Sequence, residues 1–394
     1  MGSLSQIANV TMLNVRTIPR RLGSSLVAII GIAGVVVVLV TVLSIASGFE
    51  ASMKGAGSPD RVMILRSGAD NEMSSGLAGP DIEVIKQAPG LKRDGQTLAS
   101  PELYVVIDVP KRSTNTSANV PLRGISDVAL RVRDDARIVR GRMLTFGTNE
   151  VVAGAAAARQ FVGLEPGATI RSGTQTWMVT GIFEDGGSVA ETEIWCDARV
   201  LQGAYARGNS YQSVLARLES ADAFTEAKDW LTANPQLKVS VRRETDYYAA
   251  QSTTLTGIIR GVGFGIAALM AIGAVFGAIL TMYTSVATRT REIATLRALG
   301  FNSIAVLVSV VGESLLLAAI GGLTGGLIAY AGFNGYQTST INFQTFSQVA
   351  FAFRVTPSLL AMGLTWALIM GLIGGLPPAV RAARLPIAQA LREL

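Results

Sequence analysis

The sequence lacks most of the side chains on which catalytic and metal sites depend. The chain contains no histidine, which removes the commonest general base and a common zinc ligand. Its one cysteine, Cys196, can form neither an intrachain disulfide nor a cysteine metal cluster. The chain also has no G-x-x-x-x-G-K-[ST] phosphate-binding loop. We therefore expect no catalytic residue, no metal site and no bound cofactor in this chain, ATP included.

Charged side chains are also scarce, and their distribution argues against one class of partner. They make up 16% of the chain, with a net charge of +6. Of the 34 basic and 28 acidic side chains, residues 48–257 hold 23 and 25, so the basic excess lies elsewhere. That excess flanks long apolar segments, which favours contact with membrane lipid over contact with nucleic acid.

One acidic cluster is a possible exception to the expected absence of a metal site. Glu184, Asp185, Glu191 and Glu193 flank Gly186-Gly187. Carboxylates close together are ligands that calcium prefers. A solvated loop explains the same pattern more simply, because clustered charges usually mark exposed chain. The calcium site is kept as the alternative.

Four apolar segments are each long enough to cross a bilayer, which takes about 20 residues. They comprise residues 24–47, 258–288, 301–332 and 356–380. We expect a membrane α-helical protein with four transmembrane helices and a large α/β (α+β) extracytoplasmic domain, residues 48–257, between the first and second. A cleaved signal peptide is the alternative for the first segment, but 24 uncharged residues exceed the usual apolar length.

Arginines indicate how these helices are oriented, because cytoplasmic loops are enriched in Lys and Arg. The basic segments are residues 1–23, 289–300 and 381–394, whose arginines include Arg16, Arg20, Arg21, Arg289, Arg291, Arg297, Arg381, Arg384 and Arg392. We expect these segments in the cytoplasm, as an amphipathic N-terminal segment, a short helix and a C-terminal tail. Residues 48–257 and the short link 333–355 are then external.

The predicted external domain mixes two kinds of pattern. Runs of β-branched and aromatic residues predict strands, and runs of helix-forming residues predict helices. The predicted strands are Arg61–Arg66, Leu103–Asp108 and Trp177–Phe183, and the predicted helices are Pro80–Gln87, Ala153–Val162 and Asp222–Ala233. A further helix, Asp246–Arg260, is expected to lead into the second apolar segment, so that the domain has stalk-like ends.

The segment 289–300 is a short charged helix between two apolar segments. Ile293, Leu296 and Leu299 recur at three-residue spacing, and Gly300 is placed to end the helix. Such an apolar ridge can dock into the groove of a partner. The alternative is an inert loop that only anchors the ends of two membrane helices.

This segment resembles the coupling motif of FtsX-like ABC permeases, a family that includes the MacB-like permeases. The sequence of that motif is roughly R-x-R-E-I-G-x-L-R-A-x-G. The matching residues are Arg289, Arg291, Glu292, Ile293, Leu296, Arg297, Ala298 and Gly300. Ala294 departs from the usual glycine. The segment Asn14–Leu26 and the tail Pro378–Arg392 are also similar to the family, although Pro386 stands one residue early.

The resemblance implies a permease subunit of an ABC transporter in the bacterial inner membrane. A separate cytoplasmic ATPase would bind ATP and Mg, and its closure would move residues 289–300 and, through the spans, the external domain. A homodimer or heterodimer of permeases is implied, with a periplasmic adaptor and an outer-membrane channel as further candidate partners. The implied output is efflux or extrusion. The alternative is a signalling device that regulates an envelope enzyme by mechanotransmission, without transport.

Glu313 is the one charged residue inside the third apolar segment. An ionisable group within a span costs several kcal/mol unless it is neutralised, paired or hydrated. One interpretation is structural, with the carboxyl satisfied by backbone groups or hydroxyls of neighbouring helices. A role in substrate passage or conformational coupling is the second, and proton transport is the third.

Glycines recur at four-residue spacing in three of the apolar segments. Such rows allow the backbones of membrane helices to approach closely. They comprise Gly257, Gly261 and Gly265, then Gly321 with Gly325, Gly322 with Gly326, and Gly371 with Gly375. We expect these rows to mark tight helix packing and a dimer seam.

Overall fold

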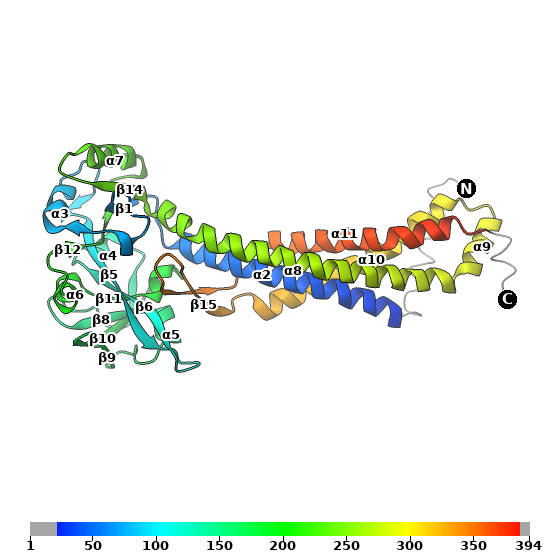
Figure 1. Ribbon diagram of the computed structural model, residues 1–394, viewed down its shortest axis with the longest axis horizontal. Helices are drawn as coiled ribbons and strands as arrows, with labels where there is room; N and C mark the ends of the chain where they lie inside the picture. The colour runs from blue at the N-terminus through cyan, green and yellow to red at the C-terminus, as the bar shows by residue number, and fades with distance from the viewer. Residues whose placement is uncertain (1–21, 387–394) are drawn as a thin grey trace. The chain divides into compact units, whose positions relative to one another are not determined.

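The computed structural model describes residues 22–386 and divides them into two compact units. A helical unit contains residues 22–47, 258–336 and 353–386, and an α/β unit contains residues 48–257 and 337–352. Most of the predicted N-terminal segment, and the tail beyond residue 386, lie outside the described residues. Figure 1 labels the elements of both units.

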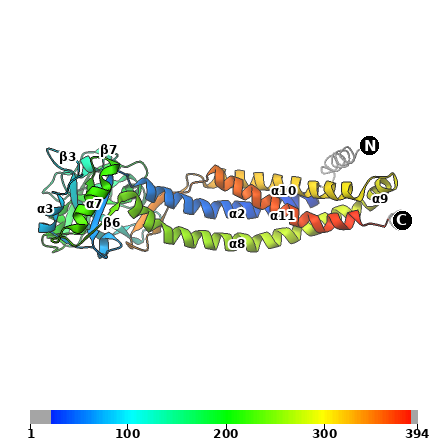
Figure 2. The same ribbon diagram turned by 90° about the horizontal axis from the view of Figure 1, so that it is seen from above.

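Within residues 22–386 the helical unit contains five helices, and four of them are long and apolar enough to cross a membrane. The long helices are α2 (Leu22–Gly55), α8 (Glu244–Thr288), α10 (Ser303–Phe333) and α11 (Pro357–Ala383), and α9 (Thr290–Ala298) is short. Figures 1 and 2 show the long helices running side by side, with α9 between the ends of α8 and α10. The prediction of four membrane helices is confirmed.

Glycines bring α10 close to two of its neighbours. A Cβ atom added at Gly325 would lie 2.6 Å from the carbonyl oxygen of Ala33 on α2. One added at Gly371 would lie 2.4 Å from the Cβ of Ala318 on α10. A Cβ atom added at Gly321, Gly322 or Gly375 would also lie close to another helix, at 3.0 Å, 2.8 Å and 2.5 Å from the nearest atom. At Gly326 this distance would be 3.2 Å. Larger residues at the tightest positions would force the helices apart.

The first glycine row behaves differently. No atom of the described residues would lie within 4 Å of a Cβ at Gly257, Gly261 or Gly265. These glycines therefore bring no other helix of residues 22–386 into close approach, and their predicted role in a dimer seam stays a prediction.

The α/β unit is built on one large mixed sheet. Its strand order is β14-β1-β13-β5-β6-β11-β8-β10-β7, with β9 paired to β10. The strands are β1 (Arg61–Arg66), β5 (Ala99–Pro110), β6 (Ser117–Ile125), β7 (Arg137–Gly141), β8 (Glu150–Gly154), β9 (Thr169–Ser172), β10 (Gln175–Glu184), β11 (Ile194–Asp197), β13 (Ser213–Arg217) and β14 (Val239–Arg243). Short pairs are formed by β2 (Leu77–Ala78) with β12 (Ser210–Tyr211) and by β3 (Arg93–Asp94) with β4 (Gln96–Thr97).

Short helices and 3-10 turns complete this unit. The helices are α3 (Gly79–Ile85), α4 (Ala129–Val132), α5 (Ala155–Gln160), α6 (Ala198–Ala204) and α7 (Phe224–Ala233), and the turns are η2 (Glu72–Ser74), η3 (Val189–Thr192) and η4 (Ala221–Ala223). An α/β domain between the first and second long helices was predicted, and the structure confirms it.

Strand β5 joins two halves of the sheet. Its first residues pair antiparallel with β13, in register Glu102 with Ser213, and its later residues pair with β6, in register Leu103 with Gly124. A separate hydrophobic core lies on each side, one among β1, β13, β14, α3 and α7 and the other among β5, β6, β8, β10 and α5. The predicted strands match β1 and parts of β5 and β10.

The helix predictions for the α/β unit were less accurate at their ends. Ala153 belongs to β8, so the helix predicted from this residue begins only at Ala155. The helix predicted from Asp222 begins at Phe224, after a 3-10 turn. The helix predicted from Asp246 is the first part of α8, which begins at Glu244 and is 45 residues long.

The predicted link between the third and fourth spans contains a β-hairpin, which the sequence analysis did not foresee. Strands β15 (Gln337–Ile341) and β16 (Gln348–Ala352) pair antiparallel and belong to the α/β unit. The hydroxyls of Ser347 and Tyr104 lie 3.0 Å apart, and the amide of Asn342 donates to Gln251 at 2.9 Å. The hairpin is therefore fixed to the α/β unit by specific polar contacts.

The acidic turn is buried, so its interpretation as a solvated loop was wrong. Asp185, Glu191 and Glu193 are all buried. The Glu191 carboxylate accepts backbone N–H bonds from Asp185 and Gly187, which holds the turn in place. Glu193 pairs with Arg123. Among residues 22–386, no group of three or more His, Cys, Asp or Glu is placed to hold a metal ion.

Candidate coupling site

The short helix α9 forms because the chain breaks from α8 at one residue. Arg289 lies between Thr288 and Thr290 with φ −110° and ψ 10°, outside the regular helical values. Gly300 follows the helix with φ +91°, a left-handed conformation that suits glycine, so α9 ends where the sequence indicated. The Asn302 side chain then accepts the N–H of Ile304 and starts α10.

The predicted apolar ridge of α9 is divided between two faces, which corrects the sequence analysis. Ile293 is buried in a cluster with residues of α8, α10 and α11, including Met282, Val310 and Ala382. Leu296 is partly buried, whereas Leu299 is 73% exposed. Three-residue spacing advances about 300° around a helix, so the three positions drift from the inner face to the outer one. Ile293 is therefore not available to dock a partner.

The charged residues of α9 are divided in the same way. Arg291 and Glu292 are exposed, as are Ala298 and Gly300. Arg297 is partly buried, and its guanidinium donates to the carbonyl oxygen of Leu385, just after α11. The outer face of α9 thus presents Arg291, Glu292 and Leu299, a mixed polar and apolar surface.

Arg289 and Glu313 form an ion pair inside the helical unit. The Arg289 Nη1 atom lies 3.0 Å from the Glu313 Oε2 atom, and both side chains are about 5% exposed. The Ser285 hydroxyl donates to the other carboxylate oxygen at 3.5 Å. The sequence analysis expected backbone groups or hydroxyls around Glu313 and placed Arg289 in the docking helix. Their direct pairing was not foreseen.

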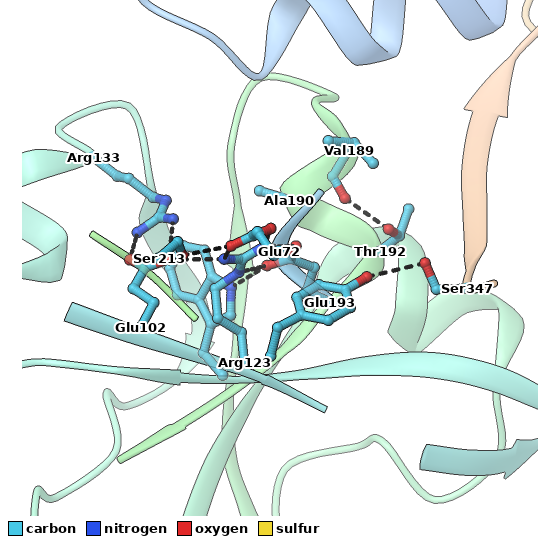
Figure 3. A network of polar contacts seen from close by, with 12 residues as sticks. Glu72, Glu102, Arg123, Arg133, Val189, Ala190, Thr192, Glu193, Ser213 and Ser347 are labelled. Carbon is cyan, nitrogen blue, oxygen red and sulfur yellow. Dashed lines mark hydrogen bonds and ion pairs between the residues drawn. The ribbon is translucent and has the colours of Figure 1, made fainter. Parts of the chain in front are cut away.

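A second set of buried charges lies in the α/β unit and was missed by the sequence analysis. Arg123 on β6 donates to Glu72 at 2.6 and 2.9 Å, to Glu193 at 2.7 and 2.8 Å, and to Glu102 at 2.8 Å. Arg133 donates to Glu102 at 2.5 and 2.8 Å. Figure 3 shows these side chains converging from separate elements. We call these five residues the buried ionic network.

The environment of Glu102 keeps its carboxyl ionised. Glu102 is fully buried, which alone would raise the pKa of the carboxyl. The guanidinium groups of Arg133 and then Arg123 outweigh burial and hold that pKa below its usual value. Glu102 thus stays charged, and the hydrogen bonds of the network join β5, β6, η2 and the chain before β11.

The network also contacts the hairpin and helix α8 through tyrosines. The Arg123 guanidinium carbon lies over the Tyr104 ring, 5.1 Å from the ring centroid. The Tyr104 hydroxyl forms a hydrogen bond with the hydroxyl of Ser347 in the hairpin. The Tyr247 hydroxyl on α8 accepts the backbone N–H of Glu72 at 3.2 Å. Segments that lead to three of the long helices therefore contact one cluster.

A cleft of about 1090 Å³ opens in the α/β unit. Its walls come from both halves of the sheet and mix charged, polar and apolar groups, including Lys86, Ser126, Asp197, Arg199 and Tyr211. It has the size of a ligand pocket but no convergent set of catalytic groups.

Comparisons with known proteins match both units. Residues 25–234 match the MacB-like periplasmic core domain, and residues 264–387 match the FtsX-like permease C-terminal region. The "Uncharacterized ABC transporter permease YknZ" of Bacillus subtilis (strain 168) is 25% identical over 396 residues, 92% of each chain.

Two solved structures are each similar to about half of the chain. The extracellular domain of the noncanonic ABC-type transporter YknZ from Gram-positive bacteria has 20% identity and a TM-score of 0.36, covering 46% of this chain and 100% of that chain. The periplasmic region of MacB from Actinobacillus actinomycetemcomitans has 15% identity and a TM-score of 0.38, covering 51% and 96%.

Four apolar helices with an α/β domain after the first define a multi-pass membrane protein whose largest connection is a folded domain. The chain belongs to the family of ABC transporter permeases of the MacB/FtsX type. The resemblance seen in the sequence is confirmed. An ABC permease implies a partner ATPase, and a permease subunit is consistent with a non-catalytic role.

Proposed function

We propose that this chain is the permease subunit of a bacterial inner-membrane ABC transporter that couples ATP hydrolysis in a separate subunit to movement of the α/β unit. The outer face of α9 is the single observation that carries the proposal. Arg291, Glu292 and Leu299 are exposed on a helix whose opposite face is packed into the spans. A partner that pushes this face would move a helix that is already attached to three long ones.

The proposed output of this movement is efflux or extrusion of an envelope or periplasmic substrate. Basic residues beside the spans support a cytoplasmic α9 and an external α/β unit. The permease works as a dimer in this proposal, with ATP and Mg bound only by the ATPase. The cleft of the α/β unit and the hairpin are external parts that a substrate or adaptor could meet. Regulation of an envelope enzyme without transport is the competing output.

The docking face is tested by placing a charge on it. Leu299→Asp removes an apolar contact, and fully burying a leucine is worth about 1.5–3 kcal/mol, so association with the ATPase should weaken by at least about tenfold. Glu292→Lys should reduce stimulated ATP hydrolysis more than association, because rim charges orient partners. The measurements are pull-down of the ATPase and hydrolysis in nanodiscs.

Val162→Asp is the matched control, because Val162 is an exposed apolar residue of the α/β unit. It should leave ATPase association unchanged. Wild-type association in Leu299→Asp would show that α9 is only a membrane-surface anchor. Export of a cargo that depends on ATP supports efflux, whereas an attached hydrolase without export supports the signalling alternative.

A further inference from the structure

The junction between α8 and α9 is held by one residue from both sides. The backbone N–H of Arg289 donates to the carbonyl of Val286 on α8 at 3.1 Å. The carbonyl of Arg289 accepts the N–H of Ile293 on α9 at 2.9 Å. The direction in which α9 leaves α8 is therefore set by the conformation of Arg289.

The side chain of the same residue reaches a third helix. Its guanidinium meets the Glu313 carboxylate on α10 at 3.0 Å, and Ser285 of α8 donates to that carboxylate. Charges that are shielded from water attract each other more strongly than surface charges and tolerate less misalignment. Three helices of the unit thus meet at one directional contact.

We propose that the Arg289–Glu313 ion pair is the joint through which a displacement of α9 is delivered to α10. The inference rests on the proposed function, in which an ATPase pushes the outer face of α9. Arg289 is then a positioning residue that acts inside the permease. It is not a contact of the ATPase, although it belongs to the motif that resembles a docking helix.

The other contacts of α9 explain why the joint is needed. Ile293 packs against the spans through apolar contacts, which impose little direction. The Arg297 guanidinium donates to the carbonyl of Leu385, after α11, and so does not join α9 to α10. The covalent link to α10 passes through Gly300 and Phe301, whose N–H groups donate to the carbonyls of Arg297 and Leu296 and so belong to the C-terminal cap of α9. Without the ion pair, a push on α9 would reach α10 only through this short turn and through apolar packing.

The surroundings of the pair leave room for it to adjust. A cavity of about 30 Å³ is lined by Arg289, Glu313, Glu292 and apolar residues of α8, α9 and α10. A cavity of about 10–15 Å³ is enough for one water molecule. Because Glu292 lines the same cavity and is exposed on its other side, a partner at the outer face would act close to the joint.

The test separates docking from transmission in the full permease bound to its ATPase in nanodiscs. Transmission is read from an environment-sensitive label at Ser113→Cys, an exposed position of the α/β unit, as its response to ATP per bound ATPase. Arg289→Met should reduce this response roughly tenfold, as expected for a residue that carries coupling, while ATPase association stays near wild type. Arg289→Lys should keep part of the response.

Arg291→Met is the matched control, because it removes the same charge from the exposed face. It should weaken association while the response per bound ATPase is retained. The double variant Arg289→Glu with Glu313→Arg should recover most of the response that either single change loses. A general loss of structure would not be repaired by such an exchange.

Each outcome bears on one of the two proposals. Failure of the wild-type permease to bind an ATPase would remove the proposed function and the joint with it. A normal response in Arg289→Met, or an exchanged pair that assembles without a response, would overturn the joint and leave the proposed function standing. If Arg289→Met does not assemble, Glu313→Gln takes its place, and a normal response in that variant overturns the joint.

Discussion

The buried ionic network predicts a large and pH-dependent loss of stability when Glu102 becomes glutamine. Glu102 is 0% exposed and accepts hydrogen bonds from both Arg133 and Arg123. Removing one partner of a buried ion pair costs about 3–5 kcal/mol, because the other charges stay buried without it. For a unit of this size such a loss should lower the melting temperature by roughly 6–20 °C.

The pH dependence of the stability difference between wild type and Glu102→Gln provides a second, independent test of this prediction. The pKa of Glu102 is lowered in the folded chain from an ordinary value of 4.5. The unfolded chain therefore binds this proton first as the pH falls. The stability that Glu102 contributes is complete above its unfolded pKa and is lost as the pH falls through the folded pKa. The difference between wild type and Glu102→Gln should be full at pH 7 and should shrink below pH 4.5.

Tryptophan fluorescence during heating is a suitable assay. Trp195 is buried, stacks on Phe183 at 3.8 Å and lies 5.4 Å from the Arg133 guanidinium, so its emission reports on the network. Glu83→Gln is the control, because Lys86 and Glu83 form a pair in which the side chains are 36% and 71% exposed, and a surface pair contributes about 1 kcal/mol or less. Equal losses in the two variants at pH 7 would refute the view that the network stabilises the α/β unit.

Two further predictions concern packing and orientation. Gly325→Ala should destabilise the helical unit by about 1–3 kcal/mol in detergent, because its Cβ would lie 2.6 Å from a backbone oxygen of α2. Gly332→Ala on the same helix is the control, because its Cβ would meet open space, and it should change the stability little. Equal melting temperatures for the two variants would contradict the close packing. An impermeant thiol reagent added to intact cells should label Ser113→Cys and spare Ser303→Cys, and the opposite pattern would reverse the proposed topology.

The elements that the sequence predicted well are those whose cause is local. A bilayer-length apolar run, such as residues 356–380, specifies a membrane helix whatever surrounds it, and the structure has α11 there. The strand Arg61–Arg66 was predicted to the residue because its apolar run lies between turn residues. Gly300 likewise marked the end of α9.

The spacing of the apolar residues in α9 could not predict which of them are buried against the other helices. Ile293, Leu296 and Leu299 lie along the helix at similar intervals, and the pattern does not state which of them turns toward the spans. The tertiary structure decides this, because α8, α10 and α11 surround Ile293 and leave Leu299 in the open. The pairing of Arg289 with Glu313 was not foreseen for the same reason.

The buried ionic network was beyond the reach of local patterns. Glu72, Glu102, Arg123 and Glu193 are separated by 21 to 70 residues from the partners they meet, and each alone looks like an ordinary surface charge. The hairpin 337–352 was missed because β15 is rich in Gln, Ser and Thr and because the link is too short to suggest a folded element. Long-range pairing, which one sequence does not display, determines both features.

The burial of Cys196 makes this protein convenient for spectroscopy. Its thiol is 0% exposed, and burial, with the neighbouring Asp197 carboxylate, raises the thiol pKa well above its ordinary value. A thiol reacts as the thiolate, so Cys196 should not react with maleimides or thiol-specific spin labels while the protein is folded. Because it is the only cysteine in the sequence, an introduced cysteine would carry the only reactive thiol. Distances across a working transporter could then be recorded without first removing a native residue from the core.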